Sequence, residues 1–230
     1  MFFLSPTYLM YMIPAFLLMA LSSWYVKSAY NKWSRVASQS RLTGTQAAQQ
    51  LINAGNLYGV QVQGTAGNLT DHYDPRDKTL YLSQGVASVA SVASVAIAAH
   101  ELGHAIQDAE GYFPLRFRGA LVPIVNIGSN LGWILIMIGL FLRFTQLAWL
   151  GILVFAGGAV FALATLPVEF NASARAKHLL VQTGIIQTDE EQRGVNAVLN
   201  AAALTYVAGL VTAVLQLLYF ASLVGGGRRR

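Results

Sequence analysis

The chain has 230 residues, of which 55% are hydrophobic and only 11% are charged. About a quarter of the residues in soluble domains are charged, so this composition, with a mean hydropathy of +0.49, excludes an ordinary soluble protein and indicates a membrane protein. The absence of cysteine excludes disulfides and cysteine-based metal sites. The net charge of +5 predicts no nucleic-acid partner, because the basic residues flank apolar runs and serve as topology signals.

The N-terminal segment is predicted to span the membrane. Residues 1–26 carry no charged side chain, and Trp24 and Tyr25 end the apolar run where an aromatic belt would lie. A cleaved signal peptide is the alternative interpretation. It is disfavoured because the positive charges, beginning with Lys27, follow the apolar run instead of preceding it.

A small α/β layer is expected next. Thr43 is suited to be a helix N-cap and Gly55 a helix stop, which predicts a short helix between them. Alternating side chains predict strands at 60–62 and 79–83, with a turn at 74–77 between them.

A Val-Ala-Ser repeat occupies residues 86–96. A membrane span that ends at the following motif is one interpretation of the repeat. Its serines and small side chains favour a tightly packed buried helix instead. The repeat leads directly into the sequence His-Glu-Leu-Gly-His at residues 100–104, which places that motif on a helix.

This motif carries the chemistry. His100 and His104 are four residues apart, so on a helix both imidazoles reach one ion, and they make up two of the four histidines in the chain. Glu101 would project near the same ion, where it can act on a water molecule. The alternative is a buried helix with incidental histidines. We predict one zinc ion per chain, with Glu101 as the catalytic residue.

Three further spans are predicted downstream. The uncharged runs 119–142 and 144–168 each match the ~20 residues that cross a bilayer. Only a short linker at Arg143 separates them, which predicts a helical hairpin, and Pro167 is expected to end or bend the second helix. Residues 189–191, which read Asp-Glu-Glu, are predicted to be a solvated helix start, and residues 201–224 are predicted to form the fourth span.

Catalytic zinc usually has three protein ligands and one open position. The candidates for the third ligand are Glu110, His72, His178 and Glu169. Glu110 follows the second histidine at a suitable spacing, but Gln107 stands where a turn glycine would be needed. Glu169 directly follows a long apolar span, where an unpaired carboxylate is costly. We favour Glu169 over the alternative that it is an interfacial carboxylate paired with Arg175 or a backbone group.

The chain resembles the YugP-like membrane zinc metallopeptidases, which are gluzincin-like and more distantly related to the HtpX heat-shock membrane proteases and the CaaX prenyl proteases. The resemblance covers most of the chain and rests on residues 41–44, 69–76 and 100–107, the later hairpin of spans, and Glu-x-x-Ala-Ser at 169–173. It implies zinc on His100, His104 and Glu169 with Glu101 catalytic. Asn171 departs from the acidic residue expected there, and Ser173 is often Asp in the broader group.

The mechanism that these residues imply is peptide hydrolysis by a zinc metalloendopeptidase. Zinc acidifies water and polarises the scissile carbonyl, while Glu101 moves the proton to the leaving amine. A second donor should stabilise the oxyanion, and the candidates are Tyr73, His72, Arg175 and His178. An extended peptide or membrane-protein substrate is expected to pair with an edge strand near residues 79–83.

Two other functions fit the motif less well. A membrane scaffold or adaptor would use zinc structurally, but structural zinc sites usually have four ligands that commonly include cysteine. A zinc-dependent hydrolase of lipid esters would use the same site. We favour the peptidase, with the lipid bilayer and a regulatory membrane protein as further partners.

The basic residues predict the orientation. If the N-terminus lies outside, eleven of the fifteen Lys and Arg residues fall on the inner side, which places the motif in the cytoplasm of a multi-pass cell-membrane protein. The expected fold is mainly α, with four transmembrane helices and a small cytoplasmic α+β zincin-like catalytic domain. The domains are 1–26 (N-terminal anchor), 27–118 (catalytic domain), 119–168 (transmembrane hairpin), 169–200 (helix with the third zinc ligand), 201–227 (C-terminal transmembrane helix) and 228–230 (tail, native or added).

Overall fold

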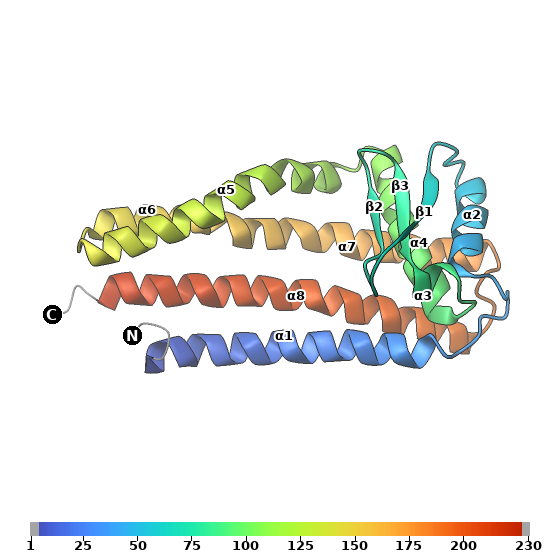
Figure 1. Cartoon of the computed structure of the whole chain (residues 1–230), viewed down its shortest axis with the longest axis horizontal. Helices are drawn as coiled ribbons and strands as arrows, with labels where there is room; N and C mark the ends of the chain where they lie inside the picture. The colour runs from blue at the N-terminus through green and yellow to red at the C-terminus, as the bar shows by residue number, and fades with distance from the viewer. Residues whose placement is uncertain (1–4, 227–230) are drawn as a thin grey trace. The chain divides into compact units, whose positions relative to one another are not determined.

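The computed structural model describes residues 5–226, so the predicted tail at 228–230 lies outside the described residues. The described chain forms eight α-helices and three β-strands (Figure 1). In chain order these are α1 (Pro6–Trp33), α2 (Gly44–Ala54), β1 (Gln61–Thr65), β2 (His72–Asp74), β3 (Thr79–Ser83), α3 (Gln84–Ala87), α4 (Val92–Ala109), α5 (Phe113–Phe141), α6 (Thr145–Phe155), α7 (Gly157–Gln182) and α8 (Asp189–Gly226).

The chain divides into two compact units. The apolar unit comprises Met1–Ser23, Phe117–Leu166 and Leu204–Arg230, and the site unit comprises Trp24–Arg116 and Pro167–Ala203. Helices α1, α5, α7 and α8 contribute residues to both units. All the residues predicted to form the zinc site belong to the site unit.

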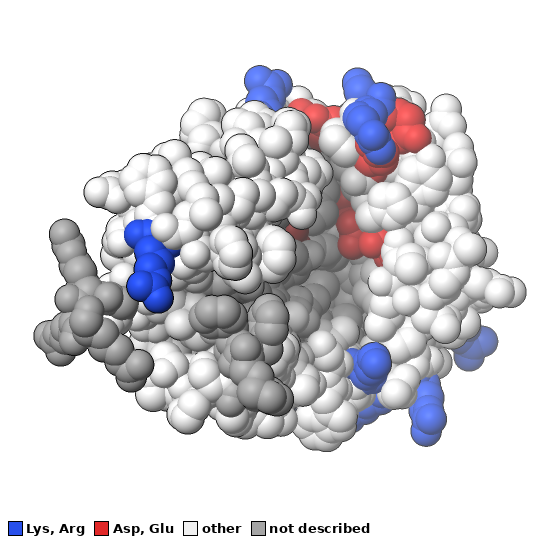
Figure 2. Space-filling view, turned by 60° about the vertical axis from the view of Figure 1, so that its left-hand side comes forward, with Lys and Arg blue, Asp and Glu red and all other residues white. Residues whose placement is uncertain are grey.

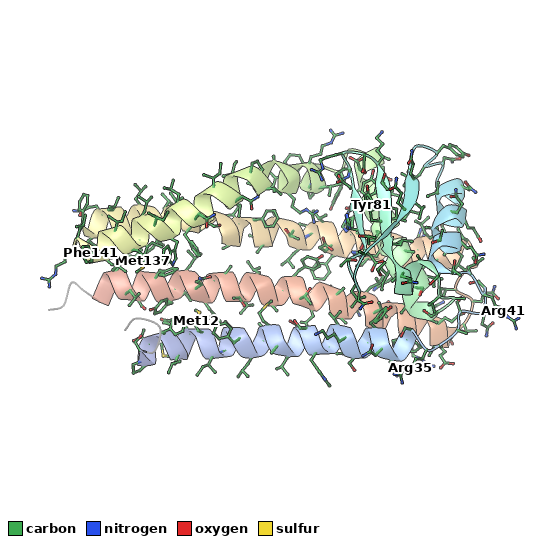
Figure 3. All side chains as sticks on the ribbon, viewed as in Figure 1. Met12, Arg35, Arg41, Tyr81, Met137 and Phe141 are labelled. Atoms are coloured by element: carbon green, nitrogen blue, oxygen red, sulfur yellow. The ribbon has the colours of Figure 1, made fainter. Side chains whose placement is uncertain are left out.

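Four helical stretches are long and apolar enough to cross a membrane, which confirms the number of predicted spans. They are Pro6–Trp33, Phe113–Phe141, Thr145–Gln182 and Asp189–Gly226. In the apolar unit their large side chains point outward: Phe141 is 87% exposed, Leu153 72% and Ile127 71%. Figure 3 shows Phe141 at the end of α5, and Figure 2 shows a face on which uncharged residues prevail. An outer surface of this kind is suited to lipid.

Helices α5 and α6 pack against each other across the short connection at Arg143. Arg143 takes a left-handed backbone conformation (φ 54°) in the short connection. The two helices then approach closely through small residues, because a Cβ atom on Gly132 would lie 2.7 Å from the backbone nitrogen of Phe155. Small residues at such crossings let helix backbones pack tightly in a membrane.

A three-stranded sheet in the site unit has the order β1-β3-β2. Strand β3 pairs in parallel with β1 and antiparallel with β2, and its Leu80 and Leu82 are fully buried. The expectation that residues 79–83 form an edge strand for the substrate is therefore wrong. Both sides of β3 already have partners, so an extended peptide can add only to β1 or β2.

The helix before the sheet begins and ends as predicted. The Thr43 side chain accepts a hydrogen bond from the Gln46 backbone amide, the Gln46 side chain accepts one from the Thr43 amide, and Gly55 follows the last turn. Residues 91–96 of the Val-Ala-Ser repeat are buried, as expected, but Ser88 and Val89 are exposed and the repeat is not one helix. It breaks after α3, and Ser91 caps α4 by accepting a hydrogen bond from the Ser94 amide. A serine in the repeat thus starts the helix that carries the motif.

Two local features differ in part from the expectations. Pro167 lies inside α7 and does not end it, and the break between α6 and α7 falls instead at Ala156, where two glycines, poor helix formers, follow. The acidic start of α8 is not fully solvated, because Glu191 is only 3% exposed. Its carboxylate accepts hydrogen bonds from the backbone amides of Gln39 and Gln187, which ties the α1–α2 connection to α8.

Candidate metal centre

Helices α4 and α7 bring three side chains that could hold a metal ion together at a buried point. His100 and His104 lie one turn apart on α4, and each is 8% exposed, while Glu169 on α7 is 2% exposed. The Glu169 Oε2 atom lies 3.3 Å from His100 Nε2 and 3.7 Å from His104 Nε2. One ligand atom from each residue lies within 4.8 Å of the others. Glu169, the candidate favoured from the sequence as the third ligand, is thus the one that the structure places beside both histidines.

The glycine of the motif permits this approach. A Cβ atom on Gly103 would lie 2.6 Å from the carbonyl oxygen of Ala172, closer than real Cβ contacts. Position 103 therefore requires glycine for the backbone of α4 to pass α7 at this distance. Since Ala172 lies less than one turn from Glu169, the close crossing also sets how near the carboxylate comes to the histidines.

Both histidines present Nε2 to Glu169 because their Nδ1 atoms have other partners. His100 Nδ1 lies 3.2 Å from the Ser173 hydroxyl, and His104 Nδ1 lies 3.0 Å from Oε1 of Gln107. Hydrogen bonds of this kind fix the ring orientation of metal-binding histidines. Ser173 follows Glu169 by four residues on α7, so one face of this helix supplies both side chains.

Glu101 is partly buried on α4, next to the first histidine. Burial raises the pKa of its carboxyl group above the ordinary value, and the neighbouring carboxylates of Glu169 and Asp71 raise it further against the opposing effect of the two histidines. Asp71 comes from the segment before β2, where its carboxylate accepts a 2.7 Å hydrogen bond from the Ser83 amide. A carboxylate with a raised pKa is suited to accept a proton and release it again.

The four candidate oxyanion donors lie in different settings. The Tyr73 hydroxyl donates to Asp108 (3.0 Å), and burial together with this bond raises the pKa of Tyr73. His72 is exposed and stacks on Tyr81 at 4.8 Å between ring centroids.

The Arg175 guanidinium donates to Glu110 (2.6 Å) and to Asn171 (2.7 Å). His178 is exposed on α7. These hydrogen bonds already use the donors of Tyr73 and of one edge of Arg175.

Glu110, the ligand candidate with a motif-like spacing, is directed elsewhere. It caps α4, is exposed, and pairs with Arg175. Arg175 lowers the pKa of the Glu110 carboxyl group. The continued helix carries Glu110 away from the histidines, as the glutamine at position 107 predicts.

Sequence reasoning missed the supporting roles of Gln107 and Asp71. Gln107 is fully buried, and its only sequence signal is an uncharged polar residue three positions after a motif histidine, on the same helical face. Asp71 gave no signal, because only the fold brings the segment before β2 near Glu101.

The donor set fits zinc. Two neutral imidazole nitrogens and one carboxylate are ligands that catalytic zinc uses, and three protein ligands leave a position for water or substrate. The chain offers no cysteine, so the usual closed structural sites with thiolate ligands do not apply. A bound metal ion would also balance the charge of the buried Glu169 carboxylate.

Comparison with known proteins agrees with this chemistry. Residues 8–225 match a family described as "putative neutral zinc metallopeptidase". The chain belongs to this family. It is also 42% identical over 203 residues to the "putative membrane protease YugP" of Bacillus subtilis (strain 168), a match that covers 88% of this chain and 90% of the relative. No solved structure matches the chain. Family membership confirms the predicted resemblance and, with the four apolar helices, supports a multi-pass membrane metalloprotease.

Proposed function

We propose that the chain is an integral-membrane zinc endopeptidase that holds one zinc ion on His100, His104 and Glu169. The observation that carries the proposal is the buried convergence of these three side chains beside Glu101. A zinc ion, when bound, acts as a Lewis acid that acidifies water and polarises a carbonyl group. The membrane protease name of the relative supports peptides or membrane proteins as substrates.

Glu101 supplies the proton transfer in this proposal. Its carboxylate accepts a proton from the attacking water and gives it to the nitrogen of the leaving group. The raised pKa of Glu101 favours this exchange, because a more basic carboxylate accepts the proton more readily. The surrounding helices bury the ligands, which keeps bulk water from competing for them.

The function is tested by metal removal from the purified protein in detergent. The zinc-loaded protein is incubated with a mixture of unstructured peptides, and the products are identified by mass spectrometry. We expect cleavage to stop when a chelator removes the metal and to return when zinc is added. Cleavage that persists in metal-free protein contradicts the proposal. Hydrolysis of phospholipid esters without peptide cleavage would replace it with the lipid-ester function.

We also propose that the zinc site faces the cytoplasm and that both termini lie outside. The basic residues Arg35 and Arg41 support this orientation: both are exposed in the connection after α1 (Figure 3), within the site unit. Positive residues next to spans remain on the cytoplasmic side.

Single cysteines test the orientation, because the chain has none of its own. Gln187 and Phe144 are exposed in two different connections, and each is replaced by cysteine in turn. In intact cells we expect an impermeant thiol reagent to label Phe144→Cys and to leave Gln187→Cys unlabelled until the cells are opened. Labelling of Gln187→Cys alone from outside would invert the orientation.

A further inference from the structure

A chain of hydrogen bonds runs from His104 to the surface of the site unit. His104 Nδ1 lies 3.0 Å from Gln107 Oε1, and Gln107 Nε2 lies 2.8 Å from the Val168 carbonyl oxygen and 2.9 Å from Asn171 Oδ1. Asn171 Oδ1 also lies 2.7 Å from Arg175 Nε. These hydrogen bonds therefore link helix α4 to two successive turns of α7, directly behind His104, one of the proposed ligands.

The two ends of this chain determine the direction of every hydrogen bond in it. The guanidinium of Arg175 can only donate, so the Asn171 atom that faces it is the amide oxygen. The Val168 carbonyl can only accept, so the Gln107 atom that faces it is the amide nitrogen. That nitrogen also donates to the oxygen of Asn171. The remaining Gln107 atom, its oxygen, can only accept, and His104 Nδ1 must therefore carry the hydrogen.

We propose that Gln107 and Asn171 are positioning residues that keep a hydrogen on His104 Nδ1 and so leave Nε2, the ring atom on the Glu169 side, to bind a metal ion. A metal ion needs the lone pair of Nε2, and a neutral imidazole in the other tautomer would present a hydrogen in its place. The inference rests on the proposed zinc centre, because the tautomer matters for function only if His104 is a ligand. Besides Glu169, α7 thus contributes Asn171, which holds Gln107 in the orientation that fixes the hydrogen of His104.

The other histidine lacks this directional control. The partner of His100 Nδ1 is the Ser173 hydroxyl at 3.2 Å, and a hydroxyl rotates and can either donate or accept. Ser173 orients the His100 ring without selecting its tautomer. The two histidines therefore differ: Gln107, itself held by α7, selects the tautomer of His104, whereas the tautomer of His100 is not selected.

Asn171 stands where an acidic residue is expected in the family, and its side-chain oxygen can accept the same hydrogen bonds. Asn171 uses its Oδ1 atom in these contacts, which accepts hydrogen bonds from both Gln107 and Arg175. An aspartate offers an equivalent acceptor, and the adjacent Arg175 balances its charge. Either residue maintains the same directions, whereas an apolar residue of similar size does not.

The test measures zinc affinity by competition with a chelator, and the tautomer of His104 by nitrogen NMR of the zinc-free protein at alkaline pH, where the imidazole is neutral, both on the full chain in detergent. The variants are Gln107→Met, Asn171→Leu and Asn171→Asp. The control is Ser94→Ala, which removes a buried hydroxyl from the same helix, where Ser94 contacts Ser91. Neither measurement depends on peptide cleavage.

We expect Gln107→Met and Asn171→Leu to weaken zinc binding by about 10–100-fold, the range found for outer partners of metal ligands, and to populate the other His104 tautomer. Asn171→Asp should keep wild-type affinity and tautomer, as should Ser94→Ala. Unchanged affinity in Gln107→Met, with zinc bound normally by the wild type, would overturn this inference alone. A wild-type protein that binds no zinc would overturn the proposed metal centre as well.

Discussion

Glu101→Gln is expected to abolish peptide cleavage while leaving zinc bound. Glutamine has nearly the same shape as glutamate, but it cannot accept a proton at neutral pH, so the exchange removes the chemistry and keeps the packing. A general base contributes typically 10²–10⁴-fold to a rate, and we expect a loss of at least that size. The measurement is peptide cleavage by the wild type and the variant at equal zinc content.

The control for this exchange is Glu190→Gln, at an exposed position in the first turn of α8. It makes the same chemical change away from the zinc site and should leave cleavage unaltered. Equal cleavage rates in the wild type and Glu101→Gln would rule out Glu101 as the base. A scaffold that uses zinc structurally also predicts an indifferent Glu101 variant, so the comparison separates the peptidase from that alternative.

The locally determined parts of this fold could be predicted from the sequence. The Thr43 cap requires only residues within one turn of a helix, and the pair His100 and His104 requires only the helical period. The spans follow from uncharged runs of sufficient length. Glu169 could be selected although it is 69 residues from His100, because a carboxylate at the end of an apolar span needs a partner.

The parts that depend on distant pairing could not be predicted. Strand β3 has the composition of any short strand, and only the pairing with β1 on one side and β2 on the other makes it central. Glu191 was expected to be solvated because acidic residues favour a helix start, but backbone amides from two other segments bury it. The role of Gln107 likewise requires α7 to lie against α4.

Loss of Glu169, the proposed third ligand, should have the largest effect on zinc binding. Glu169→Gln keeps the size of the side chain and removes the negative charge, so only the two histidine nitrogens remain, without an anionic ligand beside them. We expect zinc affinity to fall by more than the 10–100-fold that is typical of outer partners, because a direct ligand is lost. The measurement is zinc content and affinity by chelator competition, normalised to folded protein.

Glu191→Gln separates this effect from a general loss of folding. Glu191 is also a buried glutamate, at 3% exposed compared with 2% for Glu169, and it holds the α1–α2 connection to α8 through backbone amides. Its exchange removes charge-assisted hydrogen bonds, each worth about 1.5–3 kcal/mol, and should lower the thermal stability of the protein. Zinc bound per folded molecule should nevertheless remain at the wild-type level. If instead Glu169→Gln binds zinc as tightly as Glu191→Gln does, Glu169 is a structural carboxylate and another residue completes the metal centre.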